Sequence, residues 1–234
     1  MSRGVAVITF PGSNGDRDAF DAFATDLGVP TEMVDYRETN LDGFEAVVLP
    51  GGFSYGDYLR SGAIARFAPI IEPLREFARR GGPVLGICNG FQVLTEAHLL
   101  PGALLMNRTL QFQSMWVPIR VESGETAWTG NLTEGEVLTM PVANGWGNYF
   151  ADPETVERLE GDGRVVFRFV DEAGEQSERA NINGSVNNIA GITNEGRNVV
   201  GLMPHPERAA DPLLGPADGK RLIESVQSFL ASTV

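Results

Sequence analysis

Short apolar runs alternate with helical patterns through the first half of the chain, and this alternation restricts the possible folds. Runs rich in branched side chains and bounded by Gly or Pro predict buried strands at 5–10, 46–49 and 84–87. Residues 18–27 and 64–79 between them carry apolar side chains at helical spacing. Strands separated by helices predict an α/β fold, a mostly parallel open sheet with helices on both faces.

The second half is richer in strands. Gly, Asn and Asp turns separate its apolar runs, which predicts a mixed or antiparallel extension of the sheet before a closing helix at 218–230. The polar segment 171–185 is predicted to be a mobile loop, and 211–219 to be a turn before the last helix. The strands predicted here lie at 116–121, 137–140, 165–170, 189–192 and 199–203.

The size of the chain is consistent with one domain. It has 234 residues, of which 42 % are hydrophobic, and this composition supports a substantial buried core. Neither an internal repeat nor a low-complexity tract divides the sequence, so residues 1–234 are expected to form a single domain. There is no apolar run of about 20 residues and no cleavable leader, so a cytoplasmic protein without a membrane span is expected.

Charge and cysteine content exclude several classes of function. A formal net charge of −13 repels phosphate backbones and anionic lipid surfaces, so neither nucleic acid nor a membrane is an expected partner. One cysteine cannot form an intramolecular disulfide, and with only two histidines beside it the chain cannot build a Cys/His metal cage. No metal site is therefore expected, and the cysteine is either an inert core thiol or a nucleophile.

Cys88 lies between a short apolar strand and a helical pattern, within Gly86-Ile-Cys-Asn-Gly90. This Gly-x-Cys-x-Gly pattern is typical of a nucleophile elbow. The two glycines suit a tight turn with little room for a Cβ atom, and the first helical amides would face the sulfur and favour a thiolate. The backbone amide of Asn89 could donate to a developing oxyanion. A buried structural cysteine is the alternative.

A thiol nucleophile needs a base, and only two histidines are available. His98 lies ten residues beyond Cys88, about 15 Å away along a continuous helix, so a surface or packing role is expected for it. His205 follows a predicted strand and stands between two prolines, which are expected to exclude a helix and keep the chain extended. The side chains of His205 and Glu207 would then lie on the same side.

The expected triad depends on strand direction. If the strand before His205 runs parallel to 84–87, both strands end at the same carboxyl edge, where open α/β sheets place their sites. Cys88, His205 and Glu207 can then form a nucleophile–base–orienting triad. The alternative for this His-x-Glu segment is a rigid surface turn with solvated side chains.

Two glycine-rich loops are predicted at the same edge. Gly51 and Gly52 follow the strand at 46–49, and the Gly52 amide is the candidate for the second oxyanion donor, although a simple packing turn is the alternative. The loop at 10–16 is similar but lacks the Gly-Lys-Ser/Thr ending of a phosphate-binding loop, so nucleotide binding there is weakly supported.

Four motifs extend over most of the chain: Phe-Pro-Gly-Ser-Asn from residue 10, Leu-Pro-Gly-Gly-Phe-Ser-Tyr-Gly-Asp-Tyr-Leu-Arg from residue 49, Gly-Ile-Cys-Asn-Gly-Phe-Gln from residue 86 and Met-Pro-His-Pro-Glu-Arg from residue 203. These motifs resemble the glutaminase subunit of phosphoribosylformylglycinamidine synthase. That family belongs to the class I, triad-type glutamine amidotransferases, which implies a flavodoxin-like arrangement of the sheet.

The resemblance implies roles for individual residues. Cys88 would be the nucleophile, His205 the general base and acid, and Glu207 its orienting partner. Gln92 would help to hold L-glutamine, as would Gly51. The family works with a larger synthetase subunit and a small accessory subunit, and ammonia passes internally to the synthetase. ATP and magnesium would bind that partner, so no cofactor is expected in this chain.

The chain departs from the family at four positions. The family commonly has Ala-His-Gly-Glu-Gly where this chain has Asn144 and Trp146 in place of the His and Glu. Cysteines that are often present beside the two glycine loops appear here as Gly15 and Ser61, which indicates that those thiols are dispensable.

Two other functions are compatible with parts of the pattern. A cysteine-dependent α/β-hydrolase, an esterase or peptidase, shares the elbow, but its usual chain order places the acid before the histidine, whereas His205 precedes Glu207. A noncatalytic regulatory subunit with the same fold is the second alternative, and the altered segment at Asn144 and Trp146 supports it.

Overall fold

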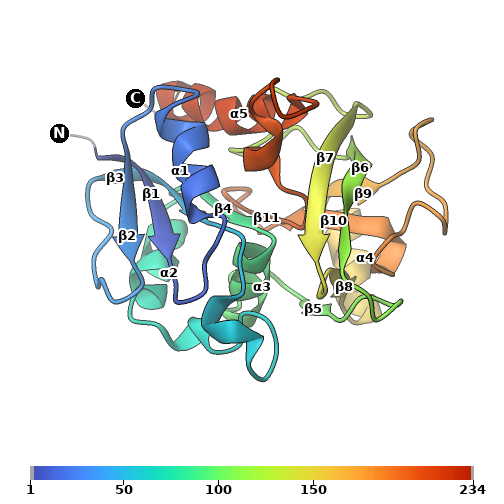
Figure 1. Cartoon of the computed structure of the whole chain (residues 1–234), viewed down its shortest axis with the longest axis horizontal. Helices are drawn as coiled ribbons and strands as arrows, with labels where there is room; N and C mark the ends of the chain where they lie inside the picture. Colours follow the sequence, from blue (N-terminus) through green and yellow to red (C-terminus); the bar gives the residue numbers. More distant parts are fainter. Residues whose placement is uncertain (1–2, 233–234) are drawn as a thin grey trace.

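A nine-stranded mixed sheet forms the centre of the molecule (Figure 1). The structure, a computed structural model, describes residues 3–232. The strand order is β2-β1-β3-β4-β11-β10-β9-β6-β7, and a separate pair, β5-β8, lies beside it. The predicted α/β class is confirmed.

The first half of the sheet is parallel. Each strand in it pairs with its neighbour in the parallel direction, from β2 through to β11. The order β2-β1-β3-β4-β11 matches the 2-1-3-4-5 order of doubly wound, flavodoxin-like sheets. Its strands are β1 (Gly4–Thr9), β2 (Thr31–Asp35), β3 (Phe44–Leu49), β4 (Val84–Ile87) and β11 (Val199–Leu202).

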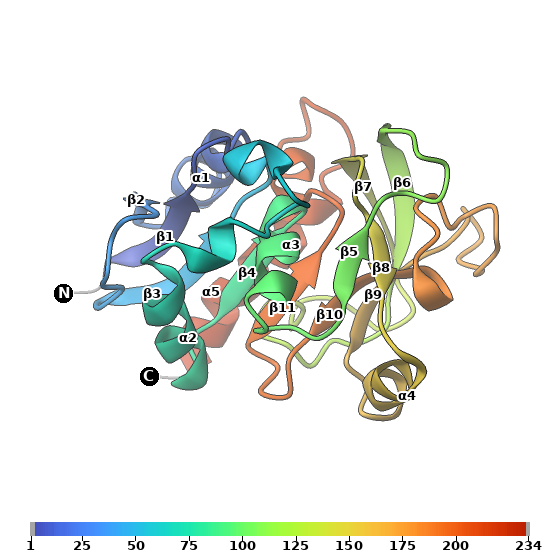
Figure 2. The same cartoon turned by 90° about the horizontal axis from the view of Figure 1, so that it is seen from below.

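The second half of the sheet is antiparallel, as the turn-rich sequence predicts. Beyond β11, every pair of neighbouring strands runs in opposite directions. Figure 2 shows the two halves as one continuous layer, with β5 and β8 in front of it. The strands are β6 (Gln113–Val121), β7 (Val137–Asn144), β9 (Val165–Phe169) and β10 (Ile189–Thr193), with β5 (Ala103–Leu105) paired to β8 (Asn148–Phe150).

Helices cover both faces of the parallel half. α1 and α5 lie on one face, and α2 and α3 lie on the other (Figure 1). The α-helices are α1 (Asp16–Ala24), α2 (Ile71–Arg79), α3 (Asn89–Glu96), α4 (Pro153–Gly161) and α5 (Asp218–Ser232). Four short 3-10 helices complete the described elements: η1 (Ser54–Asp57), η2 (Ala65–Phe67), η3 (Val186–Asn188) and η4 (Pro206–Ala209).

Sequence patterning misses four of the strands and α-helices: the strands β5 and β8, whose 3 residues each are too few to show a period, and also β2 and α4. β2 is an edge strand with a single buried residue, Val34, so it lacks the apolar run that marks the central strands. α4 buries only Thr155 and Leu159, although its start is marked by Asp152, which caps it, and by a proline in its first turn. Neither β2 nor α4 needs a strong apolar pattern because each covers little of the core.

No helix in the described part of the chain is long and apolar enough to cross a bilayer.

Candidate active site

Cys88 occupies a strained turn between β4 and α3. Its φ of 51° and ψ of −102° lie in a region that residues with a side chain rarely adopt. The backbone amide of Cys88 donates to the Leu202 carbonyl at 2.8 Å, which ties the turn to the end of β11. The side chain therefore stands at the carboxyl edge of the sheet, as the elbow pattern predicts.

The two glycines beside the cysteine allow this close packing. A Cβ atom on Gly90 would overlap the carbonyl oxygen of Leu49, at the end of β3. A Cβ atom on Gly86 would lie 2.8 Å from the Gly90 carbonyl carbon, a distance too short for real Cβ contacts. Glycine is therefore required at both positions, because backbone cannot move aside as a flexible side chain can.

Three loops meet at this edge. β4 and β11 are parallel neighbours with Ile87 opposite Leu202, so the segments that follow them leave the sheet together. A Cβ atom on Gly51, in the loop after β3, would lie 2.7 Å from Cε1 of His205 and 3.8 Å from Cβ of Cys88. The structure thus brings Gly51, Cys88 and His205 together.

Glu207 contacts His205 directly, but the local backbone is not the predicted one. Pro206 does not keep the chain extended; it opens the 3-10 helix η4, because the first position of a helix needs no backbone N–H. The expectation that two prolines exclude a helix is therefore wrong. Nδ1 of His205 nevertheless lies 2.6 Å from Oε1 of Glu207, and both side chains are buried.

The environment of His205 favours its charged form. Burial of the imidazole lowers the pKa of His205, but the carboxylate of Glu207 and the sulfur of Cys88 act in the opposite direction. Their effect is larger, and the pKa rises from 6.5 to about 10. Nε2 has no hydrogen-bond partner of standard geometry among the described residues, while Sγ of Cys88 points to the Ala143 carbonyl at 3.7 Å.

The first glycine loop orients the second. The Gly51 carbonyl accepts hydrogen bonds from the amides of Asn14 at 3.3 Å and Gly15 at 3.1 Å. Because a trans peptide places its C=O and N–H on opposite sides, the Gly52 N–H points away from the first loop. Gly52 also lines the cavity that contains Cys88. The loop at 10–16 thus has a structural role in the site.

A chain of hydrogen bonds leads from Ser54 to two residues that line the cavity, Gln92 and Trp146. The Ser54 amide donates to Oδ1 of Asn89 at 3.1 Å, and Nδ2 of Asn89 donates to Oε1 of Gln92 at 2.8 Å. Nε2 of Gln92 then donates to the Trp146 carbonyl at 2.7 Å. Both ends of the Gln92 carboxamide are thus engaged with the protein, which fixes its position beside Cys88.

The cavity beside Cys88 has a volume of about 190 Å³. Phe53 and Phe112, which are 43 % and 53 % exposed, lie at the rim of the cavity, with ring centroids 6.5 Å apart. The residues that line the cavity are Gly52, Phe53, Asp57, Ser61, Cys88, Gln92, Phe112, Ala143, Asn144, Gly145 and Trp146. Asp57, the one acidic residue in the second glycine-rich motif, has no role predicted from the sequence pattern.

Three of the four residues that depart from the family pattern line this cavity: Ser61, Asn144 and Trp146. Asn144 is buried, and its Oδ1 accepts a hydrogen bond from Nδ2 of Asn183 at 3.2 Å. Trp146 contributes its carbonyl to Gln92, so this contact does not depend on the identity of the side chain. Ser61 is buried beside the cavity, and Gly15 supports Gly51 through its amide.

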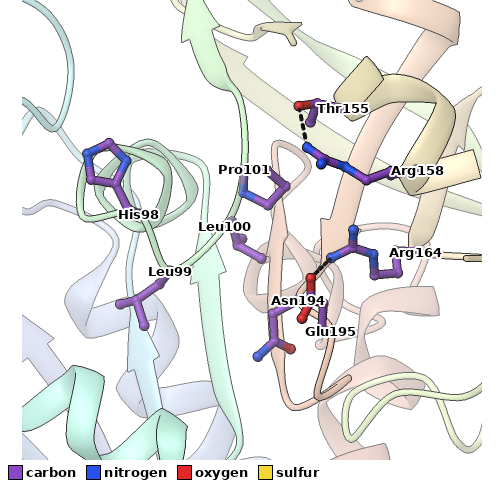
Figure 3. A pocket seen from close by; sticks show the side chains of 9 residues that line it. All are labelled: His98, Leu99, Leu100, Pro101, Thr155, Arg158, Arg164, Asn194 and Glu195. Carbon is purple, nitrogen blue, oxygen red and sulfur yellow. Dashed lines mark hydrogen bonds and ion pairs between the residues drawn. The ribbon is translucent and has the colours of Figure 1, made fainter. Parts of the chain in front are cut away.

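A second cavity of about 500 Å³ lies at the other end of α3 (Figure 3). His98 is exposed there, beyond the last turn of the helix, as expected from its distance to Cys88. The two arginines of this cavity bond to their neighbours: Arg158 to Thr155 at 3.2 Å, and Arg164 to Glu195 at 3.8 Å (Figure 3). Among residues 3–232, no group of three or more His, Cys, Asp or Glu is placed to hold a metal ion.

A parallel sheet with an elbow cysteine facing a His–Glu pair is the arrangement of class I, triad-type glutamine amidotransferases. A model of the CobB/CobQ-like glutamine amidotransferase domain matches residues 2–227. Phosphoribosylformylglycinamidine synthase subunit PurQ of Rubrobacter xylanophilus is 59 % identical, over 95 % of this chain and 96 % of the relative. The subunit of the same name from Thermomicrobium roseum is 56 % identical, over 95 % and 94 %. The chain therefore belongs to the PurQ family of glutamine amidotransferases.

Solved structures agree with this assignment. A chain of PurLQS from Thermotoga maritima is 40 % identical and superposes with a TM-score of 0.85, covering 98 % of this chain and 100 % of that chain. A glutamine amidotransferase from Thermotoga maritima has a TM-score of 0.58 at 18 % identity, covering 100 % of this chain and 86 % of its own, which shows a shared fold alone.

Proposed function

We propose that Cys88, His205 and Glu207 are the catalytic triad with which this glutaminase subunit of phosphoribosylformylglycinamidine synthase releases ammonia from L-glutamine. The observation that carries the proposal is the meeting of Cys88, which lines the cavity, with the His205–Glu207 pair at the carboxyl edge of the sheet. The raised pKa of His205 supports it, because a protonated imidazole stabilises a neighbouring thiolate.

The first half of the cycle forms a thioester. The Cys88 thiolate attacks the carboxamide carbon of glutamine, and the carbonyl oxygen becomes an oxyanion. The Asn89 amide stands in the first turn of α3, where backbone amides have no intrahelical partner, and it receives the oxyanion together with the Gly52 amide. His205 gives its proton to the departing nitrogen, and ammonia leaves.

The second half hydrolyses the thioester. His205, now neutral, takes a proton from a water molecule, and the resulting hydroxide attacks the thioester carbon. Glutamate leaves and the sulfur returns to the thiolate form. Glu207 orients His205 throughout and stabilises the imidazolium whenever it forms, because its carboxylate lies 2.6 Å from Nδ1. Gln92 lines the cavity proposed to hold glutamine, and Gly51 lies next to it, against Cys88 and His205.

The subunit acts within a complex. Its ammonia passes to the larger synthetase subunit, with a small accessory subunit completing the assembly, in purine biosynthesis. ATP and magnesium bind the synthetase, where the amide acceptor is activated, and this chain contributes no cofactor. The complex works in the cytoplasm. Residues 1–234 act as one glutaminase domain, in keeping with the single sheet that runs through both halves of the chain.

Cys88→Ala tests the assignment. We expect glutamine-dependent release of glutamate and ammonia to fall to background, because no other cysteine is available as a nucleophile. The matched control is His98→Asn, which changes the histidine at the far end of α3 and should retain activity.

Chemical labelling gives a second reading of the same assignment. A glutamine analogue with a diazoketone in place of the amide should add once to the wild type, at Cys88, as determined by mass spectrometry. Normal activity in Cys88→Ala would overturn the proposal, and so would labelling at another residue.

A further inference from the structure

Asp57 places an acidic side chain in the cavity that contains Cys88. It ends the 3-10 helix η1, and its φ of 54° is rare for a residue with a side chain. The neighbouring backbone stabilises this conformation, since the Tyr55 amide donates to the Pro11 carbonyl at 2.6 Å and the Gly56 amide to the Phe53 carbonyl at 2.7 Å. The fold thus holds this carboxyl group at the cavity in a strained backbone conformation.

The carboxyl group of Asp57 has no cationic partner among the described residues. Its Oδ1 is buried and makes no hydrogen bond, and no Arg, Lys or His forms an ion pair with it within residues 3–232. The two nearest arginines in the sequence, Arg60 and Arg66, pair with Glu96 instead. An ionised carboxylate in such a place is costly unless a ligand supplies the missing positive charge.

Ser61 is the other polar side chain beside Asp57. Burial raises the pKa of Asp57, and a hydrogen bond from Ser61 acts against this increase. The contact is loose, because neither the Ser61 hydroxyl nor Oδ1 of Asp57 has a partner of standard geometry among the described residues. Two buried oxygens with unused hydrogen-bonding capacity therefore lie on side chains that line the cavity.

The substrate of the proposed reaction carries a positive charge that could pair with the Asp57 carboxylate. L-Glutamine is a zwitterion whose α-ammonium group lies four bonds from the carboxamide carbon, about 5 Å when extended. A cavity of about 190 Å³ corresponds to only about six water volumes, so an amide at Cys88 and an ammonium at Asp57 would occupy the same small space. The aromatic rim of Phe53 and Phe112 would limit solvent access and strengthen the charge interaction.

We propose that Asp57 binds the α-ammonium group of L-glutamine and makes the site selective for amides that carry an α-amino group. The proposal rests on the glutaminase function proposed above and names the residue that recognises the amino end of the substrate. Asp57 is thus a specificity-determining residue, which does not touch the reacting carboxamide.

The test compares glutamine with glutaramate, which is glutamine without the α-amino group. A charge-assisted hydrogen bond contributes roughly 1.5–3 kcal/mol, which corresponds to roughly 10- to 150-fold. In the complex with the synthetase subunits, wild-type kcat/KM should be lower for glutaramate than for glutamine by a factor in this range. In Asp57→Asn, kcat/KM for glutamine should fall to the value for glutaramate, whose own kcat/KM should stay unchanged.

Comparing kcat/KM for the two substrates distinguishes a loss of substrate specificity from a general loss of folded, active enzyme. Asp26→Asn, the same change at an exposed site after α1, is the matched control and should leave both values unaltered. A Cys88→Ala background allows direct titration with glutamine, and adding Asp57→Asn there should raise Kd by the same factor. Equal losses for both substrates in Asp57→Asn would show a structural role and overturn the inference, and so would no loss for either. Survival of activity in Cys88→Ala would instead overturn the proposed function.

Discussion

At the scale of single residues, opposing effects act on the pKa of His205. Burial disfavours the imidazolium, whereas Glu207 and Cys88, both buried beside it, favour it more strongly, so the pKa rises to about 10. The folded protein therefore holds the proton of His205 at pH values where the unfolded chain releases it. This difference links the charge of the site to the stability of the fold.

The raised pKa of His205 predicts a pH-dependent contribution to stability. A folded-state pKa above the unfolded value stabilises the fold fully below about pH 6.5, and the contribution is lost as pH rises towards 10. We expect the free energy of unfolding to fall more steeply between pH 6.5 and 10 in the wild type than in His205→Gln, measured by urea denaturation.

Titration of the imidazole provides the direct measurement. The chain has two histidines, so NMR with labelled histidine and a His98→Asn variant assigns the His205 signal. The signal should titrate near pH 10 in the wild type and at lower pH in Glu207→Gln, because the carboxylate that raises the pKa is removed. A midpoint that is the same in both proteins would contradict the electrostatic account.

At the scale of elements, the site depends on the close approach of loops that follow neighbouring strands. The loop after β3 lies against the imidazole of His205, and its carbonyl at Gly51 is held by the amides of the loop after β1. The turn after β4 is tied to the end of β11 through the Cys88 amide. Parallel strands bring all four loops to one edge, and small residues let them touch.

Gly51→Ala should damage the site while leaving the sheet intact. A methyl group there would lie 2.7 Å from Cε1 of His205, so the imidazole has to move from its position. We expect kcat for glutamine hydrolysis to fall by roughly 100-fold, as small displacements of catalytic groups do. Circular dichroism should show an unchanged fold. Gly161→Ala, at the end of α4 with nothing within 4 Å of the added methyl, is the control and should keep full activity.

At the scale of the whole molecule, the cavity opens at an apolar part of the surface. Phe53 and Phe112 border the cavity and are about half exposed, and Leu110, two residues before Phe112, is 76 % exposed. A subunit that releases ammonia only for a partner should be slow alone, because unproductive release wastes glutamine. We expect steady-state glutaminase turnover to rise roughly tenfold or more when the synthetase subunits are added. Fast turnover of the isolated chain, unchanged by the synthetase, would contradict this coupling.

The sequence by itself determined the α/β class, the elbow at Cys88 and the choice of His205 with Glu207, although not the 3-10 helix through which the two side chains meet. These follow from short-range rules: apolar periodicity, glycine spacing in a tight turn and the exclusion of His98 by its distance along one helix. The edge strand β2 and the helix α4 escaped these rules because they bury few apolar side chains.

Only the tertiary structure decided what surrounds the cysteine. The contact between Gly51 and His205, the support of Gly51 by the first loop, and the unpaired carboxylate of Asp57 all join segments that are distant in sequence or depend on burial. No local pattern encodes such contacts, because the order of strands in the sheet brings these loops together and their packing determines which polar groups lose water.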